Sequence, residues 1–312
     1  MTLASSDRAV MALPRRRRVP LRTWATPYVL ILPGMILLAV MMVYPLIQTV
    51  VFSFAKVQLP TFALRFTGWS NFVAIFGSDN LRPMLGRTVM WIVGTVVLRF
   101  LLGFWAALTF NATVKGTVVL RILCILPWTV PSIASANLWR WLLQSDTGLI
   151  DETLKSMGLP HLALNWLADP TTALPVVMIA YSWAGFPFIM LLLLAGMHGI
   201  PKETYEAAKV DGANWWQTFR FITIPSLRGV IIIAILLEII SALNSFDMLY
   251  VLTGGGPGNS SQILSLFIYQ TGFTSFNLGG ASALSMLLLV IAFAIFIFYG
   301  IANSRTAGQE GR

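Results

Sequence analysis

Three ionisable side chains lie inside long apolar runs of this 312-residue sequence, where charges are rare and usually functional. Arg99 is midway along one run, and Glu238 and Asp247 lie along another. An unpaired charge in hydrocarbon costs at least about 2.5 to 3.5 kcal/mol, so each charge is expected to have a partner. We therefore expect Arg99 to pair with Glu238, with Asp247 or with a group on a second subunit.

Uncharged polar residues follow Glu238 at helical spacing in the same run: Ser241, Asn244 and Ser245. Polar groups inside hydrocarbon face a cavity or a partner, because they are otherwise unsatisfied. Hydroxyl and amide groups at such positions can bind a polar solute, or they can hydrogen-bond neighbouring helices together. The sequence leaves both roles open.

Residues for covalent or metal chemistry are scarce. Cys124, the single cysteine, lies in an apolar run, which excludes disulfides and thiolate metal sites as organising features. His161 and His198 are isolated, no His/Cys cluster has metal-ligand spacing, and no Ser/His/Asp set is evident. The phosphate-binding pattern G-x-x-x-x-G-K-[ST] is absent. We expect a chain that has no enzymatic activity of its own and binds no metal or cofactor.

The composition is that of a membrane protein. Hydrophobic residues make up 57% of the chain and charged residues 11%, and the mean hydropathy is +0.77. Soluble domains usually have about 25% charged residues. The net charge of +9 could suggest nucleic acid, but basic cytoplasmic loops produce the same balance, so we expect membrane lipid and no nucleic acid as a partner.

Six runs are long enough for a helix to cross about 30 Å of hydrocarbon. Helices are expected because a spanning segment must satisfy its own backbone hydrogen bonds. We therefore predict an all-α integral membrane protein with one transmembrane domain, residues 27–303, between an N-terminal tail, 1–26, and a C-terminal tail, 304–312. The predicted spans are residues 27–52, 88–110, 118–138, 173–197, 229–252 and 281–303.

Lysine and arginine set the orientation of the spans. With the N-terminus inside, fourteen of them fall in the tails and inner loops and six in the outer loops. Both termini are therefore expected on the cytoplasmic side. The fourth loop, residues 198–228, is cytoplasmic in this arrangement.

That loop contains the polar stretch EAAKVDGANWWQTF, residues 206–219. A helix is predicted to start after Pro201, which a first turn tolerates, and to break at Gly212. A second, aromatic-rich amphipathic piece with Trp215 and Trp216 is predicted before Pro225. Such a helix can lie in the lipid interface or dock to a partner.

The stretch resembles the coupling-loop signature of the membrane subunits of binding-protein-dependent ABC importers. The resemblance implies that a coupling helix inserts into a cytoplasmic ATPase, with small alanines permitting close approach and the glycine permitting a bend. The alternative is that these residues only fold the loop. The matching residues are Glu206, Ala207, Ala208, Asp211, Gly212, Ala213, Phe219 and Pro225.

Residues 244–273, NSFDMLYVLTGGGPGNSSQILSLFIYQTGF, resemble carbohydrate permeases of the maltose and glycerol-3-phosphate type. The resemblance covers nearly all of the chain from residue 27 onward and implies the type I importer permease fold in a bacterial inner membrane. It also implies alternating access between this chain and a second permease subunit. ATP and Mg would bind to a homodimeric cytoplasmic ATPase, and an extracytoplasmic solute-binding protein would deliver the sugar. The glycine run 254–258 would help that protein to dock, or it is only a turn.

The resemblance to the maltose permease pattern also implies sugar contacts at Trp128, Ser132, Gly185, Phe188, Ser241 and Ser245, and we add Asn244 and Asp247 from the physical argument. The alternative for each is helix packing. Ala242 stands where that pattern has asparagine, so maltose itself is not assigned. A rival role for Arg99 is to bind an anionic substrate such as a sugar phosphate or sulfonate.

Two rival functions remain. An ion-coupled secondary transporter would use Glu238 and Asp247 and would show an inverted repeat. A membrane-embedded transferase would need acidic metal-binding pairs facing a loop, of which Asp151 and Glu152 are the one candidate. The E-A-A loop favours the importer over both.

Overall fold

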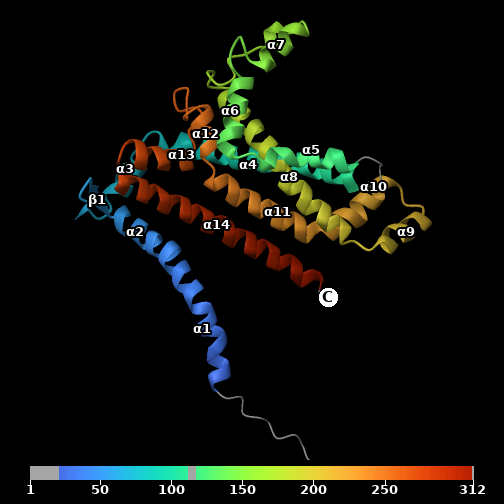
Figure 1. Ribbon diagram of the computed structural model, residues 1–312, viewed down its shortest axis with the longest axis horizontal. Helices are drawn as coiled ribbons and strands as arrows, with labels where there is room; N and C mark the ends of the chain where they lie inside the picture. Colours follow the sequence, from blue (N-terminus) through green and yellow to red (C-terminus); the bar gives the residue numbers. More distant parts are fainter. Residues whose placement is uncertain (1–20, 112–116, 311–312) are drawn as a thin grey trace, which may run out of the picture. The chain divides into compact units, whose positions relative to one another are not determined.

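The computed structural model describes residues 21–111 and 117–310 (Figure 1). The chain divides after Gln48 into two compact units. In the described part of the first unit, α1 (Leu21–Leu38) continues through a π-helical segment, η1 (Ala39–Val43), into α2 (Tyr44–Ser53), whose residues from Thr49 onward belong to the second unit. The stretch Tyr28–Ser53 is an apolar helix of 26 residues, as the sequence predicts for the first span.

The second unit contains the long helices and the short elements between them. Its elements in chain order are β1 (Ala55–Gln58), β2 (Ala63–Phe66), α3 (Ser70–Phe76), α4 (Leu81–Asn111), α5 (Thr117–Thr129), α6 (Ser132–Leu142), α7 (Leu149–Ser156), η2 (Pro160–Leu162), α8 (Ala173–His198), α9 (Lys202–Val210), α10 (Trp215–Thr218), η3 (Phe219–Thr223), α11 (Ile224–Asn244), α12 (Asp247–Leu252), α13 (Leu264–Tyr269), η4 (Gln270–Thr274) and α14 (Leu278–Glu310).

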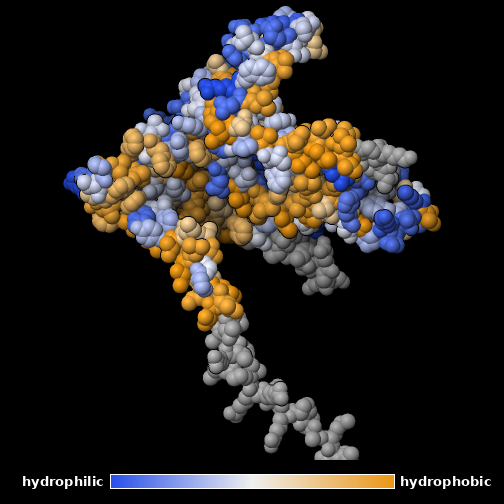
Figure 2. Space-filling model, viewed as in Figure 1, coloured by the Kyte–Doolittle hydropathy of each residue, from blue (hydrophilic) through white to orange (hydrophobic). Residues whose placement is uncertain are grey.

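The fold class is confirmed as helical and membrane-spanning. Within the described ranges, five helices are long and apolar enough to span a bilayer, and the bent pair α5–α6 makes a sixth candidate. On the face shown in Figure 2, apolar side chains cover the long helices of the second unit, whereas hydrophilic side chains gather over α7 and around α9. This is the distribution expected when lipid surrounds the helices and water surrounds their connections.

Two predicted spans are wrong in their course. The third, predicted as one helix over 118–138, bends by 100° between α5 and α6. Pro131 causes the bend, because proline lacks the backbone N–H and disfavours a helical conformation at the residue before it. The fifth, predicted to run to Leu252, ends at Asn244, where Ser245 turns extended before α12 starts.

The start of the fifth span also differs from the prediction. The aromatic piece at Trp215 is not a separate helix, because residues Trp215–Asn244 form one continuous helix. Pro225 lies in the first turn of α11, directly after the π-helical segment η3. A π-helical turn changes the local hydrogen-bond pattern, so the helix continues past a residue that has no N–H to donate.

The first loop contains a short hairpin that the sequence analysis did not predict. Strands β1 and β2 pair antiparallel, with Ala55 opposite Phe66 and Gln58 opposite Ala63. The hairpin is anchored by Asn71, whose side-chain amide donates to the backbone oxygens of Ser53 and Ala55 at 3.0 Å. The chain therefore remains predominantly helical, with this one small sheet in the described residues.

The core of the second unit is formed by α4, α8 and α11. One apolar cluster includes Trp91, Tyr181 and Ala242, and another further along the same helices includes Ala106 and Ile189. Polar side chains occupy the layer between the two clusters. Helices α4 and α8 approach closely at Gly103, because a Cβ added there would lie 2.7 Å from the Cβ of Ile189.

We expect Gly103→Ala to destabilise the helix pair by about 1 to 3 kcal/mol, because the added methyl group overpacks the contact. Gly86→Ala on the same helix is the matched control, since no atom of the described residues lies within 4 Å of the added Cβ. The measurement is the fraction of solubilised protein that stays monodisperse after heating. Equal melting of the two variants would contradict the close α4–α8 contact.

Candidate functional site

A cavity of about 640 Å³ lies where the two broken helices meet α8. It is bordered by the break between α5 and α6 and by the break between α11 and α12. Because helices at these breaks turn aside, residues at their ends face a common space. All eight residues that the sequence analysis proposes for substrate binding line this cavity: Trp128, Ser132, Gly185, Phe188, Ser241, Asn244, Ser245 and Asp247.

One wall of the cavity is aromatic. The ring of Trp128, near the end of α5, lies 6.0 Å from the ring of Phe188 on α8, with 36° between their planes. Trp128 is 49% exposed, so much of its surface is available to a ligand. An aromatic surface of this kind packs against the C–H groups of a solute.

Another wall joins the two helix breaks. Ser132 is the first residue of α6 and Asp247 the first of α12. The Ser132 hydroxyl donates a hydrogen bond to the Asp247 carboxylate. The hydrogen bond connects α6 to α12 directly beside the cavity.

The back of the cavity is a buried ion pair. Nη1 of Arg99 on α4 lies 2.7 Å from Oε2 of Glu238 on α11, and the two side chains are 6% and 5% exposed. The remaining guanidinium contacts go to α8: Nη2 donates to the backbone oxygen of Tyr181 at 2.8 Å, and Nε donates to the same oxygen at 3.3 Å. The guanidinium carbon also lies 3.6 Å from the centre of the Tyr181 ring. The expected pairing of Arg99 with Glu238 is confirmed, and Asp247 bonds to Ser132 instead.

Gly185 makes room for this arrangement. It lies on α8 one helical turn after Tyr181, and a Cβ at this position would overlap the guanidinium group of Arg99. Packing against Arg99 therefore accounts for a glycine at position 185, whether or not a substrate contacts it. Its buried backbone still borders the cavity.

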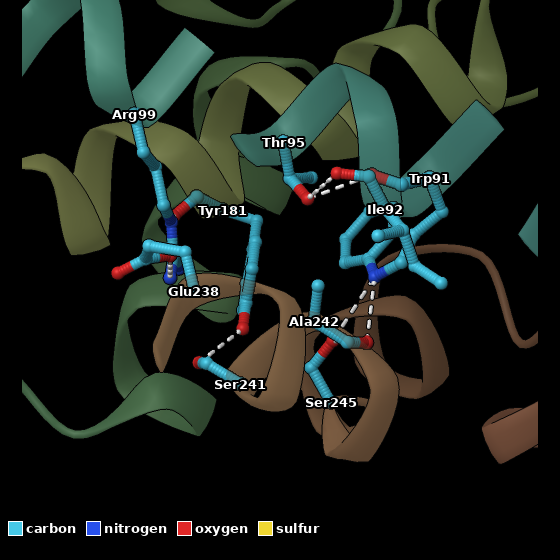
Figure 3. Close-up of polar contacts among 9 residues, drawn as sticks. All are labelled: Trp91, Ile92, Thr95, Arg99, Tyr181, Glu238, Ser241, Ala242 and Ser245. Atoms are coloured by element: carbon cyan, nitrogen blue, oxygen red, sulfur yellow. Dashed lines mark hydrogen bonds and ion pairs between the residues drawn. The ribbon is translucent and has the colours of Figure 1, made fainter. Parts of the chain in front are cut away.

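Two further contacts tie α11 to its neighbours on the same face as Glu238 (Figure 3). The hydroxyls of Tyr181 and Ser241 lie 3.0 Å apart. The indole N–H of Trp91 donates to the Ser245 hydroxyl and to the backbone oxygen of Ala242, both at 3.1 Å. Positions 238 and 241 share one face of α11, because their spacing follows the helical repeat. Ser245, directly after the end of that helix, is buried in its contact with Trp91. Ser241 and Asn244 are exposed to the cavity.

The sequence analysis did not single out Tyr181 or Trp91. Both lie in apolar runs, and both carry a polar group on an aromatic ring, a combination that needs a hydrogen-bond partner when buried. Tyr181 also precedes Gly185 by four residues, which places both on one face of α8. The four-residue spacing of Tyr181 and Gly185 was the feature of the sequence from which a role for Tyr181 could have been inferred.

The predicted coupling stretch forms helix α9 and the turn that follows it. Gly212 ends the helix with φ of +77°, a left-handed conformation that favours glycine, and the N–H of Ala213 donates back to the oxygen of Ala208 at 2.9 Å. Glu206, Ala207 and Asp211 are exposed, whereas Ala208 is buried within this chain. Of the two alanines, Ala207 is the one that a partner can touch.

The turn after α9 is fastened to the spanning helices. The next helix starts with a capping box in which Asn214 and Gln217 exchange two hydrogen bonds of 2.8 Å. Phe219 stacks on Trp215 at 5.4 Å and meets Phe104 of α4 edge-on at 5.7 Å. Pro225 follows in the first turn of α11. Packed contacts therefore hold the segment that follows α9 against α4 and lead directly into α11.

The described part of the chain contains no group of three or more His, Cys, Asp or Glu side chains placed to hold a metal ion. Its acidic pair Asp151 and Glu152 does not act jointly: Asp151 accepts a hydrogen bond from the indole of Trp166 at 2.7 Å, while Glu152 pairs with Lys155 at 3.2 Å.

Replacing only Arg99 of the buried Arg99–Glu238 ion pair should destabilise the protein more than replacing both residues. We expect Arg99→Met to cost about 3 to 5 kcal/mol, because it leaves the Glu238 carboxylate buried and unpaired. Adding Glu238→Gln should recover part of that loss. Arg82→Met, an exposed arginine on the same helix, is the control. Thermal melting of the four proteins tests the pairing, and a double variant no better than Arg99→Met would contradict it.

The fit of Gly185 against Arg99 generates a separate expectation. Gly185→Ala should lower stability by about 1 to 3 kcal/mol in the native chain, since the guanidinium must move. In the Arg99→Met/Glu238→Gln background, where the shorter side chain relieves the overlap, the same change should cost less than half as much. Gly229→Ala on α11, whose added Cβ has no atom of the structurally described chain within 4 Å, should have the same small effect in both backgrounds.

Comparison with known proteins agrees with the helical arrangement. Residues 99–308 match the family model described as the binding-protein-dependent transport system inner membrane component. A probable ABC transporter permease protein of Brucella suis is 36% identical over 90% of this chain and 97% of its own length. The trehalose/maltose transport system permease protein MalF of Thermococcus litoralis is 36% identical over 87% of this chain and 91% of its own. The sulfoquinovosyl glycerol transport system permease protein SmoG of Agrobacterium fabrum is 30% identical over 86% and 87%.

Among solved structures, a chain of a bacterial ABC transporter for the import of the acidic polysaccharide alginate superimposes with a TM-score of 0.80. It covers 91% of this chain and 96% of its own length, at 23% identity, so the likeness establishes the fold. The family match and the relatives establish more than the fold, because they extend over most of the sequence. The chain belongs to the inner membrane components of binding-protein-dependent transport systems, the permease proteins of ABC transporters.

Proposed function

We propose that this chain forms half of the translocation pathway for a carbohydrate or sugar derivative in an ATP-driven importer. The observation that carries the proposal is the cavity, which combines the half-exposed ring of Trp128 with hydroxyl, amide and carboxylate groups. Its volume of about 640 Å³ is in the range of small-molecule sites. Hydroxyl, amide and carboxylate groups are the partners that sugar hydroxyls need.

The relatives support a carbohydrate as the solute. The Thermococcus litoralis protein is named for trehalose and maltose, and the Agrobacterium fabrum protein for sulfoquinovosyl glycerol. Within the cavity, we assign stacking to Trp128 and Phe188, and hydrogen bonding to Ser132, Ser241 and Asn244. Asp247 is a further acceptor. Ser245 and Gly185 shape the wall from behind it.

We infer that α9 docks a homodimeric cytoplasmic ATPase, which binds ATP and Mg. The exposed Glu206 and Ala207 would form part of the contact, and Gly212 would hold the turn that orients α9. The hydroxyl pair Tyr205–Thr223 at 3.3 Å links α9 to η3, and Phe219 of η3 contacts Phe104 of α4. Because η3 continues into α11, a motion of the ATPase would reach the cavity walls. Both termini would lie on this cytoplasmic side.

A second permease subunit would complete the cavity, and an extracytoplasmic solute-binding protein would dock on the outer loops. The glycine-rich segment 254–258 suits docking because its backbone is well tied: Ser261 donates to the oxygen of Gly256 at 2.7 Å, and Gln270 to that of Gly254 at 2.7 Å. A segment held in this way presents a defined surface. The ion-coupled carrier is set aside because Glu238 is engaged by Arg99 and because the chain belongs to a family of ABC transporter permeases.

The coupling role of Gly212 can be tested on the complex purified through this chain and reconstituted in nanodiscs with its binding protein and a panel of sugars. Gly212→Val should abolish most sugar-stimulated ATP hydrolysis, because φ of +77° strains a β-branched residue. Gly212→Asn should retain most of it, since asparagine tolerates this conformation.

The matched control is Gly158→Val in the third loop, where φ is +74° and the added side chain also meets open space. It imposes the same backbone strain outside the coupling loop, so both valine variants should assemble and melt like the native complex. Loss of assembly in both valine variants would point to misfolding. Co-purification without any ATPase would overturn the proposed function itself.

A further inference from the structure

We propose that the cavity of this chain admits uncharged or cationic sugars and disfavours anionic ones, and that Asp247 sets this preference. The inference rests on the proposed function and narrows its substrate class. The relatives leave the question open, since trehalose and maltose are uncharged, whereas sulfoquinovosyl glycerol carries a sulfonate. For this chain, the charged side chains that line the cavity determine which of these classes of sugar it admits.

Arg99 borders the cavity but is not available to an anion. One nitrogen pairs with Glu238 at 2.7 Å, and two donate to the backbone oxygen of Tyr181. The Tyr181 ring covers a face of the guanidinium at 3.6 Å, and the side chain is 6% exposed. An anionic sugar would have to displace Glu238 from Arg99, which would leave a buried carboxylate unpaired. Binding of a sulfonate or phosphate by Arg99 is therefore disfavoured.

Among the residues that the structure describes, three charged ones line the cavity: Arg99, Glu238 and Asp247. The first two neutralise each other, which leaves Asp247 as the one carboxylate of this lining that has no basic partner among the described residues. Asp247 receives a hydrogen bond from the Ser132 hydroxyl, which is a neutral donor. A carboxylate has about four acceptor positions, so Asp247 can accept further bonds from sugar hydroxyls or from an ammonium group.

The helix ends around the cavity do not reverse this sign. The C-terminal ends of α5 and α11 carry partial negative charge, and the N-terminal ends of α6 and α12 carry partial positive charge. Both kinds of end meet at the two breaks, so their contributions oppose each other. The net potential that this chain imposes is set by the Asp247 carboxylate.

The potential can be measured without knowing the substrate. In the complex in nanodiscs without nucleotide, Asn244→Cys places a thiol on the exposed, cavity-lining end of α11, and Cys124→Ala removes the native thiol. The probes are a cationic and an anionic methanethiosulfonate of similar size, each rate being divided by its rate with a free thiol in solution. We expect the cationic reagent to react about tenfold faster than the anionic one, because the carboxylate is close and weakly screened.

Asp247→Asn should bring the ratio of the two rates close to one. The amide oxygen of the new asparagine can still accept a hydrogen bond from the Ser132 hydroxyl. Asp79→Asn, which removes an exposed carboxylate outside the cavity, should leave the ratio unchanged. An anionic reagent that reacts as fast as the cationic one, or a ratio that Asp247→Asn does not change, would overturn the inference.

A second arm uses sugar-stimulated ATP hydrolysis with glucose, glucosamine and glucuronate oligomers of equal length. The native complex should respond to the neutral and amino sugars at concentrations about tenfold below those needed for the uronate, and Asp247→Asn should narrow this gap. Preference for the uronate would contradict the inference. A cation-selective thiol reaction combined with no response to any sugar would instead count against the proposed function, so the two failures are distinguishable.

Discussion

The contact on which the rest of the structure depends is the ion pair between Arg99 and Glu238, set against Tyr181 in the layer between two apolar clusters. A buried ion pair adds little net stability, because desolvation offsets most of the attraction. The ion pair instead aligns α11 with α4. Sliding α11 by one turn would separate the pair and would also break the contacts of Ser241 and Ser245 with their neighbours. The three polar contacts therefore fix the register of α11 against α4 and α8, which apolar packing alone specifies less strictly.

The register matters because the cavity is built from helix ends. Ser132 and Asp247 can meet only if α6 and α12 both start at the same depth. Their starting points follow from Pro131 in one case and from the extended Ser245 in the other. An aligned α11 thus places Asn244 and Asp247 beside the aromatic pair of Trp128 and Phe188. The chemistry of the cavity is a product of helix positions that are decided elsewhere in the core.

Much of this could be predicted from the sequence, for reasons that are physical. Runs of apolar residues reveal spans because lipid demands them, and a lone arginine in such a run demands a carboxylate, which Glu238 supplies. The course of the third span could not be predicted in the same way: a proline in an apolar run allows a gentle kink or a bend of 100°, and packing decides which. The role of Gly185 was equally hidden, because it depends on a guanidinium that approaches from a helix 86 positions earlier in the chain. The hairpin β1–β2 has too few residues for a periodic signal.

The ends of α5 and α11 also determine what fills the cavity. The last carbonyl groups of a helix have no donor within it. The Thr129 hydroxyl donates a hydrogen bond to the carbonyl oxygen of Leu126 at 2.8 Å, and the Trp91 indole N–H donates to the carbonyl oxygen of Ala242. An end carbonyl left without a donor would cost several kcal/mol in hydrocarbon, so these helix ends favour water at the depth of the membrane. A solute that enters here replaces water rather than lipid. Its binding free energy is then set by the difference between its own hydrogen bonds and those of the water that it displaces.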